Sequence, residues 1–345
     1  MKAMTGLSHY EFEQLAPAFE HELYLHQLNR SGRIRKPGGG IKGHLPDAQA
    51  KLLFILFYIK AYPTFDVLGC LSGKSSGRSC EAAHLYLAVL QKTLGKKIQF
   101  PERKIRSMEE LLQKFPEVKD IFIDGTEQPI QRPKRTKNNK RTYSGKKKTH
   151  TRKHIVLSDE KKRILLVSPA KPGRRHDKRL TDRELLGEYI PKDVAVWADS
   201  GFQGLEQKRP PGSLTFIAEK GRKNKPLTKA ERKENYVISQ FRIVNENAIG
   251  GMKRYRATTD KLRDKIGLFD DSVMRVSAGL WNYHLASGQL EPTAKLETRL
   301  GWIVPVWEGY WGAGLKGRIE NSYEPVLSGV AIVIGRINLD IVLPL

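Results

Sequence analysis

Two stretches of the sequence decide the fold: IFIDGTE at residues 121–127 and VAVWADSG at residues 194–201. Each opens with an apolar run of strand length, and each carries an aspartate that a glycine follows within two residues. Because α/β folds place their sites where buried strands end, we expect Asp124 and Asp199 to lie at strand ends, at a sheet edge where the backbone turns away. An Asp before a Gly is also common in ordinary turns, so neither aspartate identifies a site by itself.

The elements around these stretches predict a mixed sheet. The expected strands lie at 155–157, 164–167 and 214–218, and the expected helices at 181–189, 228–255 and 272–285. Thr181 is the expected cap of the first of these helices. Antiparallel strands, a crossover through a helix, and then long helices are typical of an α/β fold whose sheet is covered by helices.

The first hundred residues are helical in pattern. Apolar spacing predicts helices at 1–31, 48–60, 65–71 and 78–94. Asp47 and Thr64 are expected caps, and Gly38 to Gly40 form a linker. Helix, short helix, glycine-containing turn and longer helix is the outline of a helix-turn-helix, whose last helix lies in a major groove. A plain three-helix packing unit fits the same pattern.

The charge of the chain indicates a nucleic acid as its partner. Among 345 residues there are 61 Lys or Arg and 37 Asp or Glu, which gives a formal net charge of +24. Phosphate backbones attract such a surface through counterion release. The strongest basic stretch, residues 132–153, alternates with polar residues rather than with the large apolar ones that a membrane-surface helix buries. We therefore expect a nucleic acid, and no membrane, as the partner, and the helix-turn-helix outline makes double-stranded DNA the expected one.

The sequence also predicts a cytoplasmic location. The N-terminus has no apolar core of signal-peptide length before Glu11. The most apolar run, residues 326–345, is interrupted by charges and falls short of a membrane span. Cys70 and Cys80 are expected to be buried, unpaired thiols of a reducing compartment rather than a bridge or a metal site.

A third acid, Glu246, belongs to the long predicted helix. Successive helical residues rotate by about 100°, so Arg242, Glu246 and Lys253, spaced four and then seven apart, share one polar stripe. A separate apolar stripe able to pack on the sheet consists of Val237, Phe241, Val244 and Ala248. The polar stripe is thus free to face a site.

Three carboxylates at one place suit phosphoryl transfer. Two Mg²⁺ about 3.5 to 4 Å apart, or Mn²⁺ as a substitute, activate the nucleophile and stabilise the leaving 3′ oxygen when hard oxygen ligands hold them. Hydrolysis releases a 3′-hydroxyl, which the same site can use to attack a second phosphodiester in strand transfer. Ser200 is a weaker candidate, as a covalent nucleophile, because no partner base is predicted beside it.

Taken together, these motifs resemble the DDE transposases of bacterial insertion sequences, in particular the group numbered five, which is related to PIF/Harbinger enzymes. The resemblance covers roughly residues 45–290 and rests on the order and spacing of the acids and on matching secondary structure. It implies a ribonuclease-H-like fold in which Arg242 and Lys253 contact DNA. The catalytic, metal-binding residues that it implies are Asp124, Asp199 and Glu246. The family pattern has a tyrosine three residues before the arginine, where this chain has Ser239.

Basic residues that follow Asp124 are expected to contact DNA. Residues 132–153 contain eleven Lys or Arg and no acid, and like-charge runs of this kind stay disordered. We expect a disordered loop that orders on phosphate, with a merely solvated loop as the alternative. The residues expected to contact DNA there are Lys146, Lys147, Lys148 and Arg152. His176 and Asp177 either support the metal site or belong to a polar loop.

Two adjacent glycines, Gly250 and Gly251, interrupt the long helical pattern. Each costs a helix about 1 kcal/mol relative to alanine. Close approach of a DNA strand explains them, and so does a break in the helix.

The chain divides into four segments. They are a helical segment and linker at 1–40, a helix-turn-helix-like domain at 41–98, a catalytic domain at 115–290 and a tail of unknown role at 291–345. The tail suits an added dimerisation element or sequence appended by a shifted stop codon. We expect a nucleoid-associated transposase that cuts terminal inverted repeats, joins the 3′-hydroxyl to target DNA, and acts as a homodimer or higher oligomer. A DNA-binding regulator derived from such an enzyme, or a ribonuclease-H-type nuclease, is the alternative.

Overall fold

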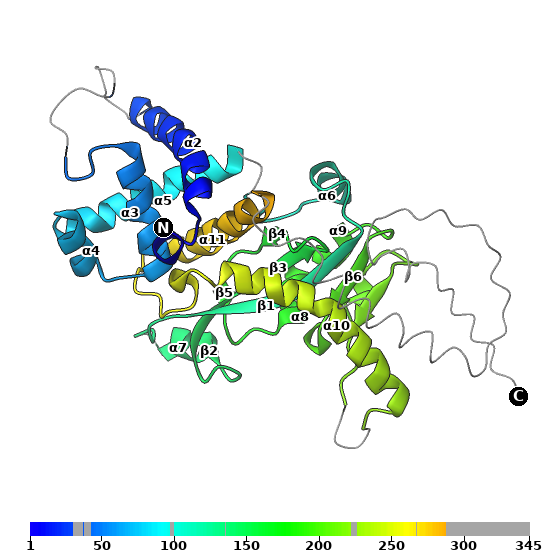
Figure 1. Cartoon of the computed structure of the whole chain (residues 1–345). Coiled ribbons are helices and arrows are strands. Elements are labelled where there is room, and N and C mark those ends of the chain that lie inside the picture. Colours follow the sequence, from blue (N-terminus) through cyan, green and yellow to red (C-terminus); the bar gives the residue numbers. More distant parts are fainter. Residues whose placement is uncertain are drawn as a thin grey trace, which may run out of the picture. The chain divides into compact units, whose positions relative to one another are not determined.

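The computed structural model describes residues 1–29, 37, 43–96, 100–134, 136–221, 226–266 and 268–287 (Figure 1). The expected tail at 291–345 lies outside the described residues. The linker expected at residues 38–40 lies outside them as well.

Helices precede the sheet, as the apolar spacing predicted. They are α1 (Lys2–Thr5), α2 (His9–Leu28), α3 (Ala48–Ala61), α4 (Phe65–Ser72) and α5 (Ser76–Lys96). The predicted caps Asp47 and Thr64 accept backbone hydrogen bonds at the starts of α3 and α4. The single helix expected at 1–31 is wrong, because Gly6 ends α1 with a φ of 80° and Ser8 starts α2 in a capping box with Glu11.

The core of the N-terminal helices continues into the last helix, α11 (Phe269–Ala286). Val273, Leu280 and Tyr283 of α11 belong to the same apolar cluster as the buried residues of α2 to α5. Glu11 of α2 is fully buried, and its Oε1 lies 2.5 Å from Nδ1 of His284. The N-terminal helices are therefore packed directly against α11.

A mixed sheet follows, and the described residues contribute seven strands to it. The strands are β1 (Asp120–Pro129), β2 (Tyr143–Ser144), β3 (Thr149–Asp159), β4 (Ile164–Val167), β5 (Lys171–Pro172), β6 (Ala195–Ala198) and β7 (Thr215–Ile217). Their order is β2-β3-β1-β6-β7, with β4 and β5 also pairing with β3. β1 is antiparallel to β3 and parallel to β6, and β6 is parallel to β7. The predicted mixed α/β sheet is confirmed, and its architecture is compatible with a ribonuclease-H-like fold.

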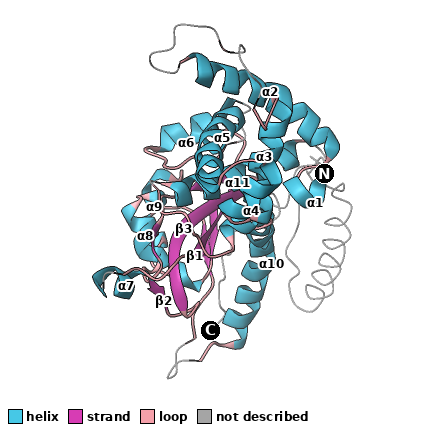
Figure 2. Cartoon of the chain, turned by 90° about the vertical axis from the view of Figure 1, so that its left-hand side faces the viewer, coloured by secondary structure: helices cyan, strands magenta, loops and turns pink. Residues whose placement is uncertain are grey.

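Helices cover the two faces of this sheet (Figure 2). Ile121 and Ile123 of β1 pack with the apolar residues of α6 (Met108–Lys114), α8 (Asp177–Arg183) and α9 (Leu186–Tyr189). On the other face, Phe122 stacks on Trp197, which stacks on Phe241 of α10 (Lys229–Met252). Because side chains alternate along a strand, Asp124 points to the same face as Phe122, toward α10.

Some expected boundaries are wrong. The helix expected at 181–189 is two helices, α8 and α9, and His176 rather than Thr181 precedes the first residue of α8. Cys70 is exposed and Cys80 is half-buried, so the expected buried thiols are also wrong.

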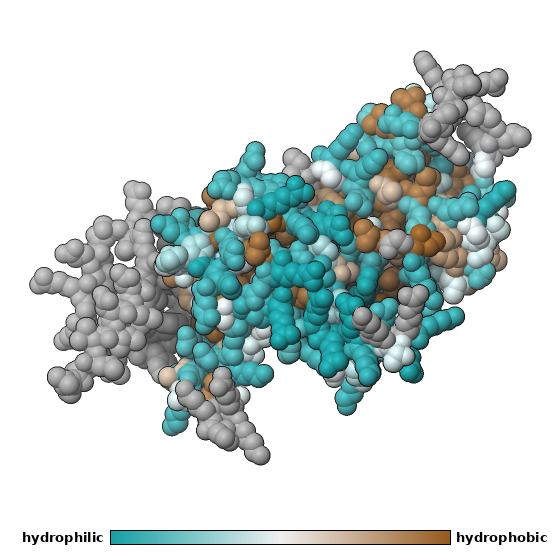
Figure 3. Space-filling view, turned by 180° about the vertical axis from the view of Figure 1, so that it is seen from behind, coloured by the Kyte–Doolittle hydropathy of each residue, from teal (hydrophilic) through white to brown (hydrophobic). Residues whose placement is uncertain are grey.

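The surface is consistent with the basic, polar composition. The face seen in Figure 3 is mostly hydrophilic over the sheet and its helices, and hydrophobic residues are more prominent over the N-terminal helices. In the described part of the chain, no helix is both long and apolar enough to cross a bilayer.

Candidate active site

The register of two parallel strands brings Asp124 and Asp199 together. Ile123 of β1 pairs with Ala198 of β6, so the two aspartates occupy the next position on adjacent strands. The parallel pairing ends there, and Asp199 begins a short 3-10 helix, Ser200–Phe202. Oδ1 of Asp199 accepts a hydrogen bond from the N–H of Gly201 at 2.7 Å, and Oδ1 of Asp124 accepts one from the N–H of Gly125 at 2.7 Å.

Asp124 lies inside β1 rather than at its end, which corrects the expectation. β1 continues to Pro129 because the eleven-residue β3 supplies antiparallel partners along its whole length. The sheet edge at Asp124 is created where β6 ends. The carboxylate is therefore held by a strand that pairs with β3 both before and after Asp124.

The surroundings of Asp124 disfavour its negative charge. The pKa of Asp124 is raised from 3.8 to about 6, chiefly by burial and also by the charges of Asp199 and Asp177, while the Gly125 N–H and Arg242 oppose the rise. A carboxylate in this position favours a bound cation. The hard oxygen donors fit Mg²⁺ or Mn²⁺ better than a soft metal.

Asp177, the first residue of α8, reaches the same place. A Cβ on Gly125 would lie 2.6 Å from Oδ1 of Asp177, and one on Gly201 would lie 3.6 Å from its Oδ2. Gly125 thus leaves space for this carboxylate, whereas a side chain at position 201 would only touch it. Nζ of Lys153 lies 2.9 Å from Oδ1 of Asp177 and 3.3 Å from Oε1 of Glu127.

The polar stripe of α10 faces these carboxylates. Nη2 of Arg242 lies 3.9 Å from Oδ2 of Asp124. Burial lowers the pKa of Lys253. The charges of Lys147 and Lys146 lower this pKa further, whereas the charge of Asp124 raises it, so Lys253 at the C-terminal end of the stripe lies within the electrostatic influence of Asp124. Glu246 lies between these two residues on the stripe, and its side chain is exposed.

The buried side of α10 differs in part from the predicted apolar stripe. It consists of Ile238, Asn245, Ala248, Ile249, Gly251 and Met252. Asn245 accepts a hydrogen bond from Ser158 of β3 at 2.8 Å, and Phe241 stacks on Trp197. These contacts fix the rotation of the helix that aims Arg242 at Asp124.

The three predicted acids do not close around a single point. Within the described ranges, Cys80, His84 and Asp264 are the only group of three or more His, Cys, Asp or Glu residues whose ligand atoms all lie within 4.8 Å of one another. Asp124 and Asp199 follow neighbouring positions of two paired strands, whereas Glu246 is an exposed residue of α10.

The basic segment is folded, which contradicts the expected disordered loop. Its described residues form α7 (Thr136–Thr142), β2 and the start of β3. The hydroxyl of Thr142 lies 3.0 Å from Nδ1 of His150, and the ring of Tyr143 meets that histidine edge-on. Pairing of β2 with β3 therefore outweighs the repulsion between like charges.

Arginines line a hollow beside this segment. Its volume is about 670 Å³, and its lining residues are Arg141, Pro172, Arg174, Arg175, His176, Arg179 and Arg183. An adjoining hollow shares Arg174 and His176 and adds Tyr143 and Lys140. Sequence reasoning named His176 but missed these arginines, since the only signal was the run Arg174-Arg175 before α8.

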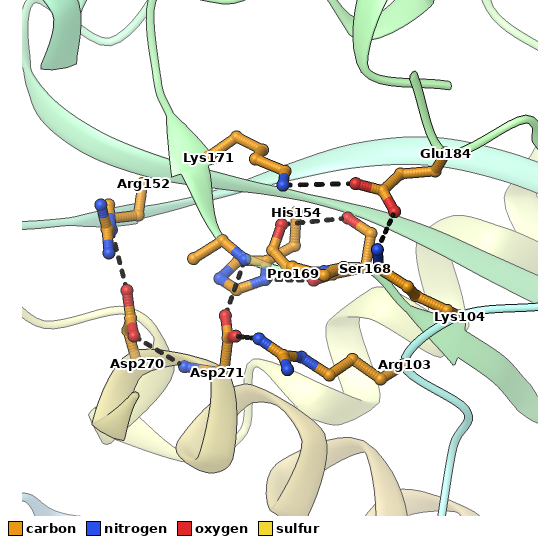
Figure 4. Close-up of polar contacts among 11 residues, drawn as sticks. Arg103, Lys104, Arg152, His154, Ser168, Pro169, Lys171, Glu184, Asp270 and Asp271 are labelled. Atoms are coloured by element: carbon orange, nitrogen blue, oxygen red, sulfur yellow. Dashed lines mark hydrogen bonds and ion pairs between the residues drawn. The ribbon is translucent and has the colours of Figure 1, made fainter. Parts of the chain in front are cut away.

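Arg152 is already paired with a carboxylate (Figure 4). Its Nε donates to Oδ2 of Asp270 at 2.8 Å, and the neighbouring Asp271 pairs with Arg103. Both aspartates belong to the first turn of α11. Arg152 therefore ties β3 to α11, whereas Lys146, Lys147 and Lys148 lie in the exposed turn between β2 and β3.

Gly250 and Gly251 have separate explanations, and the helix does not break there. A Cβ on Gly251 would overlap the indole ring of Trp281 in α11, so this glycine permits close packing of the two helices. A Cβ on Gly250 would meet nothing within 4 Å.

Comparisons with known proteins match the part of the chain that contains these carboxylates. The family described as "DDE superfamily endonuclease" matches residues 123–282. The chain is 27% identical over 289 residues, 83% of its own length and 94% of the relative's, to the "Probable transposase for insertion sequence element IS702" of Microchaete diplosiphon. No solved structure matches the chain significantly. Residues 123–282, which contain Asp124, Asp199 and Glu246, thus match the DDE superfamily endonuclease family, and the similarity over most of the chain supports a transposase of an insertion sequence.

Proposed function

We propose that this transposase cuts DNA at the terminal inverted repeats of its element and joins the freed 3′-hydroxyl to target DNA, using two Mg²⁺ held by Asp124, Asp199 and Glu246. The observation that carries the proposal is that Asp124 and Asp199 each directly follow the last pair of two parallel strands, with Arg242 of α10 close to Asp124. Transposases act on DNA, and DDE superfamily endonucleases are metal-dependent.

The proposed division of labour follows from position. When bound, the two ions would supply activation of the attacking oxygen and stabilisation of the leaving 3′ oxygen and of the phosphate charge. Asp124 and Asp199 offer their oxygens from the sheet, and Glu246 offers its own from the facing helix. Asp177, held by Lys153, supports the negative potential at Asp124. His176, at the start of α8, lines the arginine-rich hollow.

The basic residues around the carboxylates are proposed to bind the DNA backbone. Arg242 and Lys253 bracket Glu246 on one stripe, and the exposed turn carries Lys146, Lys147 and Lys148. Phosphate contacts of this kind position the duplex without reading its sequence. Arg152 contributes less, because Asp270 already neutralises its guanidinium.

The N-terminal helices are proposed to address the repeat sequence. Helix-turn-helix proteins contact bases with the N-terminal residues of the second helix. α5 is packed against α2, α3, α4 and α11, and Gly77, Arg78 and Glu81 are exposed in its first turns. A groove contact through these turns agrees with the predicted domain at 41–98, and the catalytic domain at 115–290 would then act on DNA as a homodimer or higher oligomer.

The decisive experiment compares cleavage of DNA that carries the repeat of the element. Asp124→Asn, Asp199→Asn and Glu246→Gln should bind the DNA as the wild type does and lose at least about a hundredfold in cleavage rate, as removal of one preorganised electrostatic group does. Glu234→Gln, an exposed acid on the same helix, is the matched control and should cut normally.

Each alternative function predicts a different result. If the three variants cut as fast as the wild type, the acids are not the metal ligands. If the wild type binds the repeat and never cuts with Mg²⁺ or Mn²⁺, the chain is a DNA-binding regulator. If it cuts DNA without any repeat, or RNA–DNA hybrids, at the same rate, it is a nuclease of ribonuclease-H type.

A further inference from the structure

A second cluster of metal-ligating side chains lies away from the carboxylates of the endonuclease site. Cys80 and His84 are four residues apart on α5, so both point from the same face of the helix. Asp264 comes from the segment between the 3-10 helix Arg256–Thr258 and α11. One ligand atom from each of the three residues lies within 4.8 Å of the other two.

Asp264 is fixed in place before any ion binds. Its side chain is 1% exposed, its Oδ1 accepts a hydrogen bond from the N–H of Ile266 at 2.8 Å, and its Oδ2 lies 2.6 Å from Nε2 of His84. The imidazole packs against the ring of Phe269 at 5.0 Å. Second contacts of this kind orient ligands in metal sites.

The charge at this cluster favours a cation. Among the described residues, His84 is the only side chain in hydrogen-bond contact with the Asp264 carboxylate. The adjacent Arg263 is committed elsewhere, since its Nη2 donates to the carbonyls of Tyr62 and Pro63 at 2.6 and 2.7 Å. A buried carboxylate is costly unless it is paired or coordinates a metal. A divalent ion would therefore lower the free energy of this cluster.

We propose that Cys80, His84 and Asp264 form a zinc site. A thiolate, an imidazole and a carboxylate are the donors that Zn²⁺ takes in proteins, with bonds of about 2.0 to 2.3 Å in tetrahedral geometry. Two nitrogen and oxygen ligands of one such ion are about 3.3 Å apart, so the His84–Asp264 contact opens by less than an ångström. The exposed side of Cys80 and His84 admits water as the fourth ligand.

The ion would join the N-terminal helices to the catalytic sheet. Two residues before Asp264, the N–H of Leu262 donates to the carbonyl of Pro129 at 2.8 Å, at the end of β1. β1 is the strand that carries Asp124. Zinc between α5 and Asp264 would thus fix the proposed DNA-addressing helices relative to the strand that carries the chemistry. The site stands on its own contacts, whatever the endonuclease site does.

Cobalt is the probe, because Co²⁺ occupies zinc sites and a thiolate ligand gives it a near-ultraviolet charge-transfer band. The full chain is stripped with EDTA, returned to excess Mg²⁺ so that carboxylate sites are filled, and titrated with CoCl₂. Wild type, Cys70→Ser and Asp124→Asn should show the band saturating at one Co²⁺ per chain. ZnCl₂ should then abolish it, because zinc binds such sites more tightly than cobalt.

Cys80→Ser should lose the band, and His84→Gln and Asp264→Asn should weaken Co²⁺ binding by more than about tenfold, the lower end of what loss of even an outer partner causes. Circular dichroism checks that each variant is folded. Cys70→Ser is the matched control, since Cys70 is the other cysteine and is exposed. A wild type without the band, or a Cys80→Ser variant that keeps it, overturns the proposal and leaves the His84–Asp264 contact as a plain ion pair.

Discussion

Replacing Asp124 by asparagine should stabilise the metal-free protein at neutral pH while it abolishes cleavage. Asparagine has the same shape and keeps an oxygen for the Gly125 N–H, which donates to Oδ1 at 2.7 Å. It removes the negative charge that burial, Asp199 and Asp177 disfavour. A catalytic residue that weakens the fold in this way is typical of a site held under strain for function.

The magnitude follows from the pKa of Asp124, which is raised from 3.8 to about 6. Each pKa unit corresponds to about 1.4 kcal/mol, so the two units give a ceiling of about 3 kcal/mol. The side chain is 24% exposed, and solvent screening reduces this ceiling. We therefore expect the free energy of unfolding of Asp124→Asn to exceed that of the wild type by about 1 to 2 kcal/mol at pH 7.5. Each kcal/mol corresponds to a rise in melting temperature of about 2 to 4 °C.

The sign of the pH dependence is fixed by the raised folded-state pKa. The folded protein binds this proton more tightly than the unfolded chain does. The contribution of the protonated Asp124 to the stability of the fold is complete below pH 4 and is lost as the pH rises toward 6. The advantage of Asp124→Asn over the wild type should thus be full at pH 7.5 and shrink at pH 5.

Thermal unfolding in EDTA at both pH values measures this difference. Asp193→Asn, which removes an exposed carboxylate, is the control and should change neither melting temperature by more than a degree or so. Adding Mg²⁺ should raise the melting temperatures of the wild type and of Asp193→Asn, but not that of Asp124→Asn. An Asp124→Asn variant that is no more stable than the wild type at pH 7.5 would show that Asp124 is not desolvated and repelled as argued.

Two further predictions concern packing. Gly251→Ala should destabilise the protein by about 1 to 3 kcal/mol, because the added methyl overlaps Trp281. Gly250→Ala should instead stabilise α10 by up to about 1 kcal/mol. Chemical denaturation of the two variants measures both changes, and equal effects would refute the packing argument. Glu11→Gln should cost about 3 to 5 kcal/mol by breaking a buried pair with His284. An unchanged unfolding midpoint for Glu11→Gln would contradict the stabilising role of the Glu11–His284 pair.

Much of the site could be predicted because its signals are local. The apolar run before Asp199 and the spacing from Arg242 to Lys253 follow from strand and helix periodicity, and those elements exist as expected. The position of Asp124 within β1 could not be predicted in the same way. It depends on how far β3 pairs beyond the end of β6, which is a property of the sheet and not of either strand.

Charge alone left open which basic residues are available to DNA. Arg152 and Lys153 belong to the same basic run as Lys147, yet Asp270 engages the first and Asp177 the second. Asp270 lies 118 residues after Arg152, and Asp177 lies 24 residues after Lys153, so a local stretch of sequence cannot reveal the first of these pairs. Like-charge repulsion predicted disorder, and the hairpin partner that overcomes it became visible only in the folded chain.

The sequence by itself determined most of the elements and predicted the three acids and a polyanionic partner, because periodicity, turn chemistry and charge can be read along the chain. Only the tertiary structure decided that Asp177 enters between two glycines, that Gly251 makes room for Trp281 and that Asp264 meets Cys80 and His84. Each of these contacts joins separate elements. Their geometry is fixed by strand register and helix packing, which local sequence constrains only weakly.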